Sequence, residues 1–326
     1  MQVINALVSV IGGLAASFLV YLALNWVVGR FNQKWNARLL PYVFIAPVLV
    51  LISLFLLYPA VRTIVLSFYD ASGTRFLGLE NYAALFTSGD FLDVLLNNLL
   101  WILVVPAITV VIGLGIATFA DQLGPIREKI FKSAIFFPMA ISFVAAATIW
   151  RFVYMYSAPG QPQVGLLNAV FTGITGGEPV PWLTVSSGHL NSFLMMVAVI
   201  WLNAGFAMVL LSSAIKGVPI ETVEASQIDG ASGRQAFFQV IVPQIRGTII
   251  AVFVTVLIGV MKIFDIVFAM TGGSYGTSVL GMEFINQLFN FGNPGKAAAV
   301  VTVLMVAVIP VMVYQVRSYR SQEELR

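Results

Sequence analysis

Side chains able to do chemistry are scarce in this chain of 326 residues, which has one histidine, no cysteine and 10% charged residues. His189 has no neighbouring pattern for a metal site or a catalytic triad, and the sequence contains no phosphate-binding loop of the Walker type. We therefore expect no catalytic residues, no bound metal and no cofactor in this chain. We also do not expect the chain to use ATP by itself.

Three polar residues inside apolar runs remain as candidates for function. Lys262 and Asp265 are three residues apart, close enough on one helix to neutralise each other as a structural pair. Alternatively, the pair or Asp265 alone faces a polar translocation path. Asn203 is flanked by Trp201 and Phe206, and at that depth an amide hydrogen-bonds a neighbouring helix or a polar substrate. An aromatic face beside an amide suits a sugar.

A polar segment between two apolar runs, residues 219–243, is here called the polar hairpin. Pro219 is placed to start a helix, Gly230 to end it in a left-handed conformation, and Pro243 lies at the far end of the next helical stretch. The small residues of the segment leave a thin face that suits the groove of another protein. The pattern predicts two short helices with a sharp turn and a partner on the cytoplasmic side.

The composition predicts that long apolar helices position the polar candidates and the polar hairpin. The chain is 59% hydrophobic with a mean hydropathy of +0.94, whereas an ordinary soluble domain has about 25% charged residues. Continuous runs long enough to cross a bilayer occur at about 3–28, 40–68, 94–120, 134–154, 190–214, 247–270 and 297–316. The sequence therefore predicts an all-α integral membrane protein with about seven transmembrane helices.

The distribution of basic residues predicts the orientation. The first run is followed by Arg30, Lys34 and Arg38 rather than by a cleavage site, so we expect a retained helix with its N-terminus outside and the C-terminus in the cytoplasm. The other basic residues then gather in cytoplasmic segments, as the positive-inside rule expects. The net charge of +3 reflects this orientation, and no extended basic surface indicates a nucleic acid partner.

The polar hairpin resembles the coupling loop, or EAA loop, of permease subunits of bacterial ATP-binding-cassette (ABC) importers. The family pattern is matched by Glu224-Ala225-Ser226, Gly230, and Val240, Val242 and Pro243. Flanking residues, with Phe76–Tyr82, Phe136-Phe137-Pro138 and Thr271-Gly272-Gly273, are similar to the maltose and α-glucoside branch of this binding-protein-dependent transport family. One departure is Ser274-Tyr275, where the family usually has Gly-Pro.

The resemblance implies a domain organisation and a set of site residues. Residues 1–38 would form an additional transmembrane helix with a basic linker, and residues 39–326 a six-helix importer core with the coupling loop at about 216–246. The residues expected to couple to the ATPase are Glu224, Ala225, Ser226, Asp229, Gly230, Ala231 and Pro243. The residues expected along the substrate path are Val199, Leu202, Asn203, Phe206, Val260, Ile263 and Asp265.

The same resemblance implies partners and a mechanism. The expected partners are two ABC subunits that use ATP and Mg²⁺, a second homologous permease, an external substrate-binding protein and a sugar, all at the bacterial inner membrane. The sugar would be a disaccharide, an α-glucoside or a glucosyl osmolyte, moved by alternating access. An ion-coupled secondary transporter using Asp265 is the alternative, although inverted repeats with broken helices are not evident in the sequence. A membrane scaffold is a third reading, which leaves the spacing in the polar hairpin unexplained.

Overall fold

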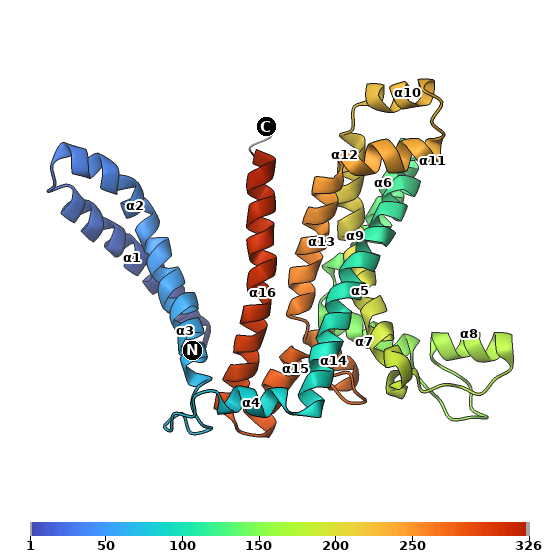
Figure 1. Ribbon diagram of the computed structural model, residues 1–326, viewed down its shortest axis with the longest axis horizontal. Helices are drawn as coiled ribbons and strands as arrows, with labels where there is room; N and C mark the ends of the chain where they lie inside the picture. The colour runs from blue at the N-terminus through green and yellow to red at the C-terminus, as the bar shows by residue number, and fades with distance from the viewer. Residues whose placement is uncertain (1, 324–326) are drawn as a thin grey trace. The chain divides into compact units, whose positions relative to one another are not determined.

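The computed structural model describes residues 2–323 of the chain, which are nearly all helical (Figure 1). Within these residues the extended structure is one antiparallel bridge between Tyr69 and Phe76. The chain forms two compact units, Met1–Leu66 and Ser67–Arg326. The predicted all-α class is confirmed.

The first unit is a helical hairpin. It contains α1 (Gln2–Val28), α2 (Gln33–Ile52), a π turn (Ser53–Leu57) and α3 (Tyr58–Leu66). The compact units divide after residue 66, whereas the sequence suggested a boundary at 38, because α1 and α2 pack against each other and α2 continues through the π turn into α3. The π turn precedes Pro59, whose ring would otherwise clash with the carbonyl four residues earlier.

The second unit holds the remaining helices. In chain order these are α4 (Glu80–Phe86), α5 (Gly89–Ala120), α6 (Pro125–Phe136), α7 (Phe143–Val153), α8 (Leu166–Thr175), α9 (Leu190–Lys216), α10 (Ile220–Ile228), α11 (Gly233–Ala236), α12 (Val242–Gln244), α13 (Arg246–Met261), α14 (Asp265–Thr271), α15 (Leu280–Ile285) and α16 (Pro294–Glu323). A 3-10 turn (Phe137–Ala140) extends α6, and π turns follow α11 (Phe237–Ile241) and α15 (Asn286–Asn290).

Four helical segments among the described residues are long and apolar enough to cross a membrane, namely Gln33–Leu66, Gly89–Ala120, Ser187–Lys216 and Pro294–Arg317. The number rises to six if two bent pairs each count as one span. Helix α1 coincides with the first predicted span, but the side chains of its first ten residues, 2–11, lie outside the described part of the chain. The prediction of about seven spans is therefore consistent with the structure only roughly.

Two predicted spans are broken. The run 134–154 was expected to be one helix, but α6 with its 3-10 turn ends at Ala140, α7 starts at Phe143, and the two meet at 104°. Pro138 and the Ser142 hydroxyl, which caps α7 by accepting from the Ala145 N–H at 3.2 Å, explain the break. The run 247–270 also divides, because α13 ends at Met261 and α14 begins at Asp265.

Small residues bring the central helices close together. A Cβ atom on Gly113 of α5 would lie 2.5 Å from the Cβ of Ala207 on α9, and one on Gly205 of α9 would lie 2.5 Å from the Ile135 carbonyl on α6. These distances are too short for any side chain, so only glycine permits this packing. Helices α5, α6 and α9 consequently form one closely packed block.

Candidate functional site

The first arm of the polar hairpin ends in a Schellman motif. The Ala231 N–H donates to the Ser226 carbonyl at 2.9 Å, and the Gly230 N–H donates to the Gln227 carbonyl at 3.0 Å. Gly230 has φ +91°, a conformation that side chains disfavour. The structure confirms the predicted end of this helix at Gly230.

The second arm starts with a capping box. The Ser232 hydroxyl accepts from the Gln235 N–H at 3.4 Å, while the Gln235 carboxamide accepts from the Ser232 N–H at 2.8 Å. The arm continues through the π turn that precedes Pro243 and then bends by 68° into α13. The two short helices and the sharp turn predicted from the sequence are therefore confirmed.

The polar hairpin presents most of its surface to solvent. Glu224, Ala225, Asp229, Gly230 and Pro243 are exposed, and Ser226 and Ala231 are half-buried. Apolar side chains are exposed beside them, because Ile228 is 86% and Ile220 is 65% exposed. These exposed aliphatic side chains are available for contact with a partner protein.

A cluster of four charged residues and one serine joins α9 to α5 and α6 where α9 enters the polar hairpin. We call it the ion cluster; its members are Asp121, Glu128, Lys132, Ser212 and Lys216. The Lys132 ammonium lies 2.8 Å from the Asp121 carboxylate and 2.6 Å from that of Glu128, and also donates to Ser212. The Ser212 hydroxyl donates to Asp121 at 2.8 Å, and Lys216 pairs with Glu128.

The ion cluster was missed in the sequence because its members are far apart in the chain. Ser212 and Asp121 are 91 residues apart, and the basic residues of this region were interpreted only as markers of orientation. Lys216 is the last residue of α9, directly before the polar hairpin. The ion cluster therefore fixes the base of the first arm to the α5–α6 turn.

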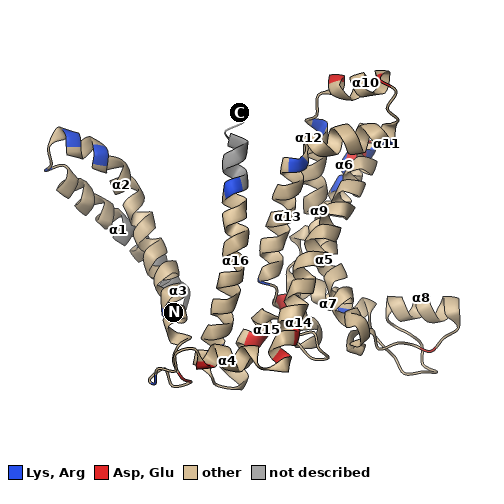
Figure 2. Cartoon of the chain, viewed as in Figure 1, with Lys and Arg blue, Asp and Glu red and all other residues tan. Residues whose placement is uncertain are grey.

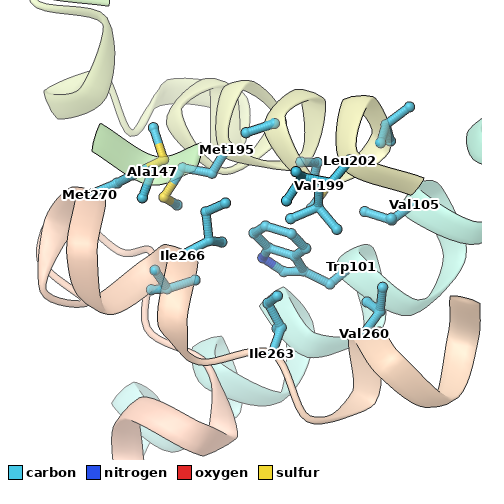
Figure 3. Close-up of a cluster of buried hydrophobic side chains, with 14 of the residues drawn as sticks. Trp101, Val105, Ala147, Met195, Val199, Leu202, Val260, Ile263, Ile266 and Met270 are labelled. Atoms are coloured by element: carbon cyan, nitrogen blue, oxygen red, sulfur yellow. The ribbon is translucent and has the colours of Figure 1, made fainter. Parts of the chain in front are cut away.

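The predicted substrate-path residues lie in two environments. Val199, Leu202, Val260 and Ile263 are each at most 5% exposed and surround Trp101 of α5 in a packed hydrophobic cluster (Figure 3). Among the described residues, the buried indole N–H of Trp101 has no hydrogen-bond partner. Trp101 is not among the residues predicted from the sequence, although a tryptophan within an apolar run is a visible signal. Passage of any solute between these residues requires the cluster to open.

The three polar candidates, Asn203, Lys262 and Asp265, do not have the partners expected from the sequence. The Asn203 amide donates at 2.8 Å to the Val199 carbonyl of its own helix rather than to a neighbouring one, and Asn203 and Phe206 are half-buried. Lys262 and Asp265 do not share a helix, because the chain breaks between α13 and α14. Both are exposed, and no ion pair joins them among the described residues. The expected structural pair is therefore wrong.

The loop after α14 lies at the opposite end of the second unit from the polar hairpin (Figure 1). Gly272, Gly273, Tyr275 and Gly276 all have positive φ, and Tyr275 adopts φ +58° despite its side chain. The Asn97 amide donates to the carbonyls of Gly276 at 2.6 Å and Ser278 at 3.0 Å, and Asn191 to that of Tyr275 at 2.9 Å. Neutral amides thus hold this loop in a strained shape.

A third amide organises the segment between α7 and α9. The buried Asn168 of α8 donates to the carbonyls of Met155 at 3.1 Å and Val180 at 2.9 Å, and it accepts from the Val180 N–H and the Trp182 indole N–H, each at 2.9 Å. A cavity of about 360 Å³ lies beside this segment. Its lining residues are Arg151, Tyr154, Met155, Tyr156, Pro181, Leu183, Thr184, Met270, Thr271 and Tyr275.

Basic residues gather at one end of the second unit. Lys and Arg of α6, α9, α11 and α13 lie at the end that carries the polar hairpin (Figure 2). The opposite end carries several Asp and Glu residues on α4, α14 and α15 (Figure 2). This asymmetry agrees with the charge pattern of the sequence.

The sequence is similar to known transport proteins. Residues 109–321 match the family described as binding-protein-dependent transport system inner membrane component. The chain is 41% identical to the alpha-glucoside transport system permease protein AglF of Rhizobium meliloti, with 97% of each chain covered. It is 44% identical to the osmoprotective compounds uptake permease protein GgtC of Synechocystis, with 87% of this chain and all of the relative covered.

The fold is similar to that of a chain in the crystal structure of a bacterial ABC transporter involved in the import of alginate, an acidic polysaccharide. The TM-score is 0.73 at 20% identity, covering 88% of this chain and 98% of the other. The family match and the two relatives show that the chain belongs to the family of binding-protein-dependent transport system inner membrane components.

Proposed function

We propose that the chain is the transmembrane permease subunit of an ATP-driven importer of a sugar, an α-glucoside, a disaccharide or a glucosyl osmolyte. The observation that carries the proposal is the polar hairpin, a rigidly turned pair of helices with Glu224 and Ile228 exposed. The relatives named for alpha-glucosides and osmoprotective compounds support this substrate class. ATP and Mg²⁺ would be used by two partner ABC subunits, with the polar hairpin seated in a groove of one of them.

The contacts of the polar hairpin support a relay to the membrane helices. A displacement of its first arm acts on Lys216, which the ion cluster ties to the α5–α6 turn. Because glycine contacts also join α6 and α9 closely, we expect the block of α5, α6 and α9 to move with the arm. ATP-bound partners would favour one position of this block over the other.

Movement of this block offers a way to open the predicted path. Trp101 on α5 and Val199 on α9 meet Val260 on α13 in the hydrophobic cluster, so separation of α13 from the block would expose them. The unpaired indole N–H of Trp101 would then find a hydroxyl acceptor on a sugar. Asn203 and Phe206 would contribute at the edge of the same path, and Asp265 at its end opposite the polar hairpin.

The distribution of basic residues along the sequence supports a cytoplasmic position for the polar hairpin and the C-terminus and an external position for the N-terminus. The amide-held loops at the opposite end would then receive the external substrate-binding protein. A second homologous permease would complete the path.

The proposal is tested by purifying the tagged chain gently from its native membrane and measuring sugar uptake and ATPase activity after reconstitution. We expect an ABC ATPase and a second permease to accompany the chain. The variant Glu224→Ala is expected to lower uptake at least tenfold while the chain still inserts in the membrane. The matched control Glu221→Ala, on the same exposed helix, is expected to retain uptake.

Two outcomes would contradict the proposal. A chain that purifies alone in several mild detergents and takes up solute without ATP would favour the ion-coupled alternative. Equal loss of uptake in the Glu221→Ala and Glu224→Ala variants would show that the helix tolerates no substitution, and the coupling role of Glu224 would then be rejected.

A further inference from the structure

Helix α8 (Leu166–Thr175) has an apolar face that its own chain does not cover. Val170 is 48%, Leu166 is 63% and Ile174 is 81% exposed. These residues are spaced four apart, so they form one stripe along the helix. Ala169 and Gly173, which lie beside the stripe, are also exposed, so no polar side chain interrupts it.

The other face of α8 packs on the loop that surrounds it. Asn168 is held by four hydrogen bonds to Met155, Val180 and Trp182, and Phe171 meets the Trp182 ring edge-on at 5.5 Å between centroids. At the start of the helix, a Cβ on Gly165 would lie 2.1 Å from the Met155 carbonyl. The helix is therefore fixed in place, and its rotation determines where the stripe points.

The stripe points toward the side on which the membrane spans lie. Helix α8 runs across the direction of the long helices, and the loop that packs on it lies on the side away from the polar hairpin (Figure 1). The uncovered face is consequently turned back toward the level of α5 and α9. Helix α8 contacts α7, and α7 itself carries an exposed aromatic residue, Phe152.

The absence of charged residues around α8 indicates that lipid covers its apolar stripe. No charged residue occurs between Arg151 and Glu178, whereas protein-binding surfaces are enriched in arginine and aromatic residues. Aliphatic side chains can be buried at the boundary between lipid headgroups and acyl chains, where the strength of binding increases with the apolar area that is buried. We propose that α8 is an interfacial anchor whose Leu166, Val170 and Ile174 side chains insert into the bilayer leaflet remote from the polar hairpin.

The absence of cysteine in the chain permits a direct test. Single variants Ile174→Cys and Val170→Cys, and the control Gln161→Cys on the exposed loop before α8, are labelled with an environment-sensitive nitrobenzoxadiazole dye. The full chain is reconstituted in phosphatidylethanolamine–phosphatidylglycerol vesicles with or without nitroxide-labelled acyl chains. Equal unfolding temperatures of the three variants show that each has folded.

We expect the labels at positions 174 and 170 to emit at shorter wavelength than the label at 161. They should lose roughly half of their intensity to the nitroxide lipid, since interfacial helices lie about 5–10 Å deep. Equal quenching of all three labels by aqueous iodide would overturn the proposal. Shielding that develops only when the external binding protein is added would also overturn it, in favour of a protein-binding face. The measurement requires no transport, so it is independent of the proposed function.

Discussion

The two ends of the second unit are held together by different kinds of polar interaction. At the end with the polar hairpin, Lys132 and Lys216 join α5, α6 and α9 through carboxylates. At the opposite end, neutral amides of Asn97, Asn168 and Asn191 bind backbone carbonyls. A carboxylate accepts an ammonium from many directions, whereas an amide clamped between two backbone groups fixes one loop conformation.

This difference fits different tasks for the two ends. Charged contacts tolerate small displacements between helices, because the attraction falls slowly with distance. The amide contacts hold φ angles that side chains disfavour, such as that of Tyr275, and would be lost if the loop shifted. The hairpin end is therefore built to transmit movement, and the opposite end is built to keep its shape.

The largest effect is expected from removing the most highly bonded amide. Asn168→Ala would leave the carbonyl and N–H of Val180, the Met155 carbonyl and the Trp182 indole without their partner. We expect a loss of roughly 3 kcal/mol in the free energy of unfolding, since each buried unpaired group costs about 1–3 kcal/mol.

Thermal unfolding in detergent measures this loss, and protease cleavage within 155–182 should increase. The matched control Asn290→Ala removes an exposed amide that bonds only to Asn286 and should change stability little. Similar unfolding temperatures for the two variants would contradict the special position of Asn168.

A smaller effect on stability, but a larger one on transport, is expected at the ion cluster. Lys132→Met should lower the free energy of unfolding by about 1 kcal/mol, because ion pairs near a surface contribute little each. It should nevertheless reduce the sugar taken up per ATP hydrolysed, since the base of the polar hairpin would then be tied to α6 only through the pair of Lys216 with Glu128. The ratio of sugar transported to ATP hydrolysed measures this reduction, and Lys132→Arg should restore much of the ratio.

The matched control is Lys129→Met, which removes an exposed lysine of the same helix. A rise in salt concentration gives a second test of the difference between the two ends. Mobile ions screen the interaction between exposed charges over a distance of about 10 Å at 0.1 M. The stability difference between the parent and Lys132→Met should shrink as salt rises, and that caused by Asn168→Ala should not. Equal salt dependence at both ends would refute the distinction drawn between them.

Replacing Tyr275 by glycine tests the strain at the amide-held end. The substitution relieves a left-handed conformation that costs about 1–3 kcal/mol for a side-chain-bearing residue but adds backbone entropy to the unfolded chain worth about 0.5–1 kcal/mol. We expect an unchanged or slightly higher unfolding temperature. The control Tyr156→Gly, at an exposed tyrosine without positive φ, should lower it; a fall as large in Tyr275→Gly would show that Tyr275 is not strained.

Local sequence signals predicted the polar hairpin well because its shape depends on neighbours in the chain. Gly230 and the Ser232–Gln235 capping box act within a few residues of their partners. Apolar runs likewise predicted the membrane class. They did not predict the breaks at Ser142 and Lys262, because hydropathy reports compatibility with lipid and is indifferent to helix continuity.

Local sequence patterns do not predict contacts between residues that are far apart in the chain. The ion cluster depends on α9 returning to α5, and the surroundings of Trp101 depend on several segments that are far apart in the chain. The roles of the predicted path residues, from Val199 to Asp265, stay predictions. The burial of Val199 and Val260 adds one physical condition, which is that the path must open before these residues meet a solute.

The smallest effect concerns Asp70, a charged residue at the amide-held end. The Ser72 hydroxyl donates to the Asp70 carboxylate at 2.8 Å, and the N–H groups of Thr74 and Arg75 donate at 3.0 and 3.2 Å. Chiefly through Ser72, these bonds hold the pKa of Asp70 below its ordinary value of 3.8. Since the folded pKa is lowered, the stabilisation of this turn is complete above pH 3.8 and is lost as the pH falls through the folded value.

A carbon-13 NMR titration of the Asp70 carboxyl tests this account. Ser72→Ala should move the titration midpoint upward toward 3.8, while Ser157→Ala, in a different loop, should leave it in place. Because the bonds of Asp70 remain within residues 70–75, its protonation should alter this turn and leave the unfolding temperature of the helices nearly unchanged. A large fall in that temperature on protonation of Asp70 would mean that charge at this end also joins helices, and the contrast with the ion cluster would then fail.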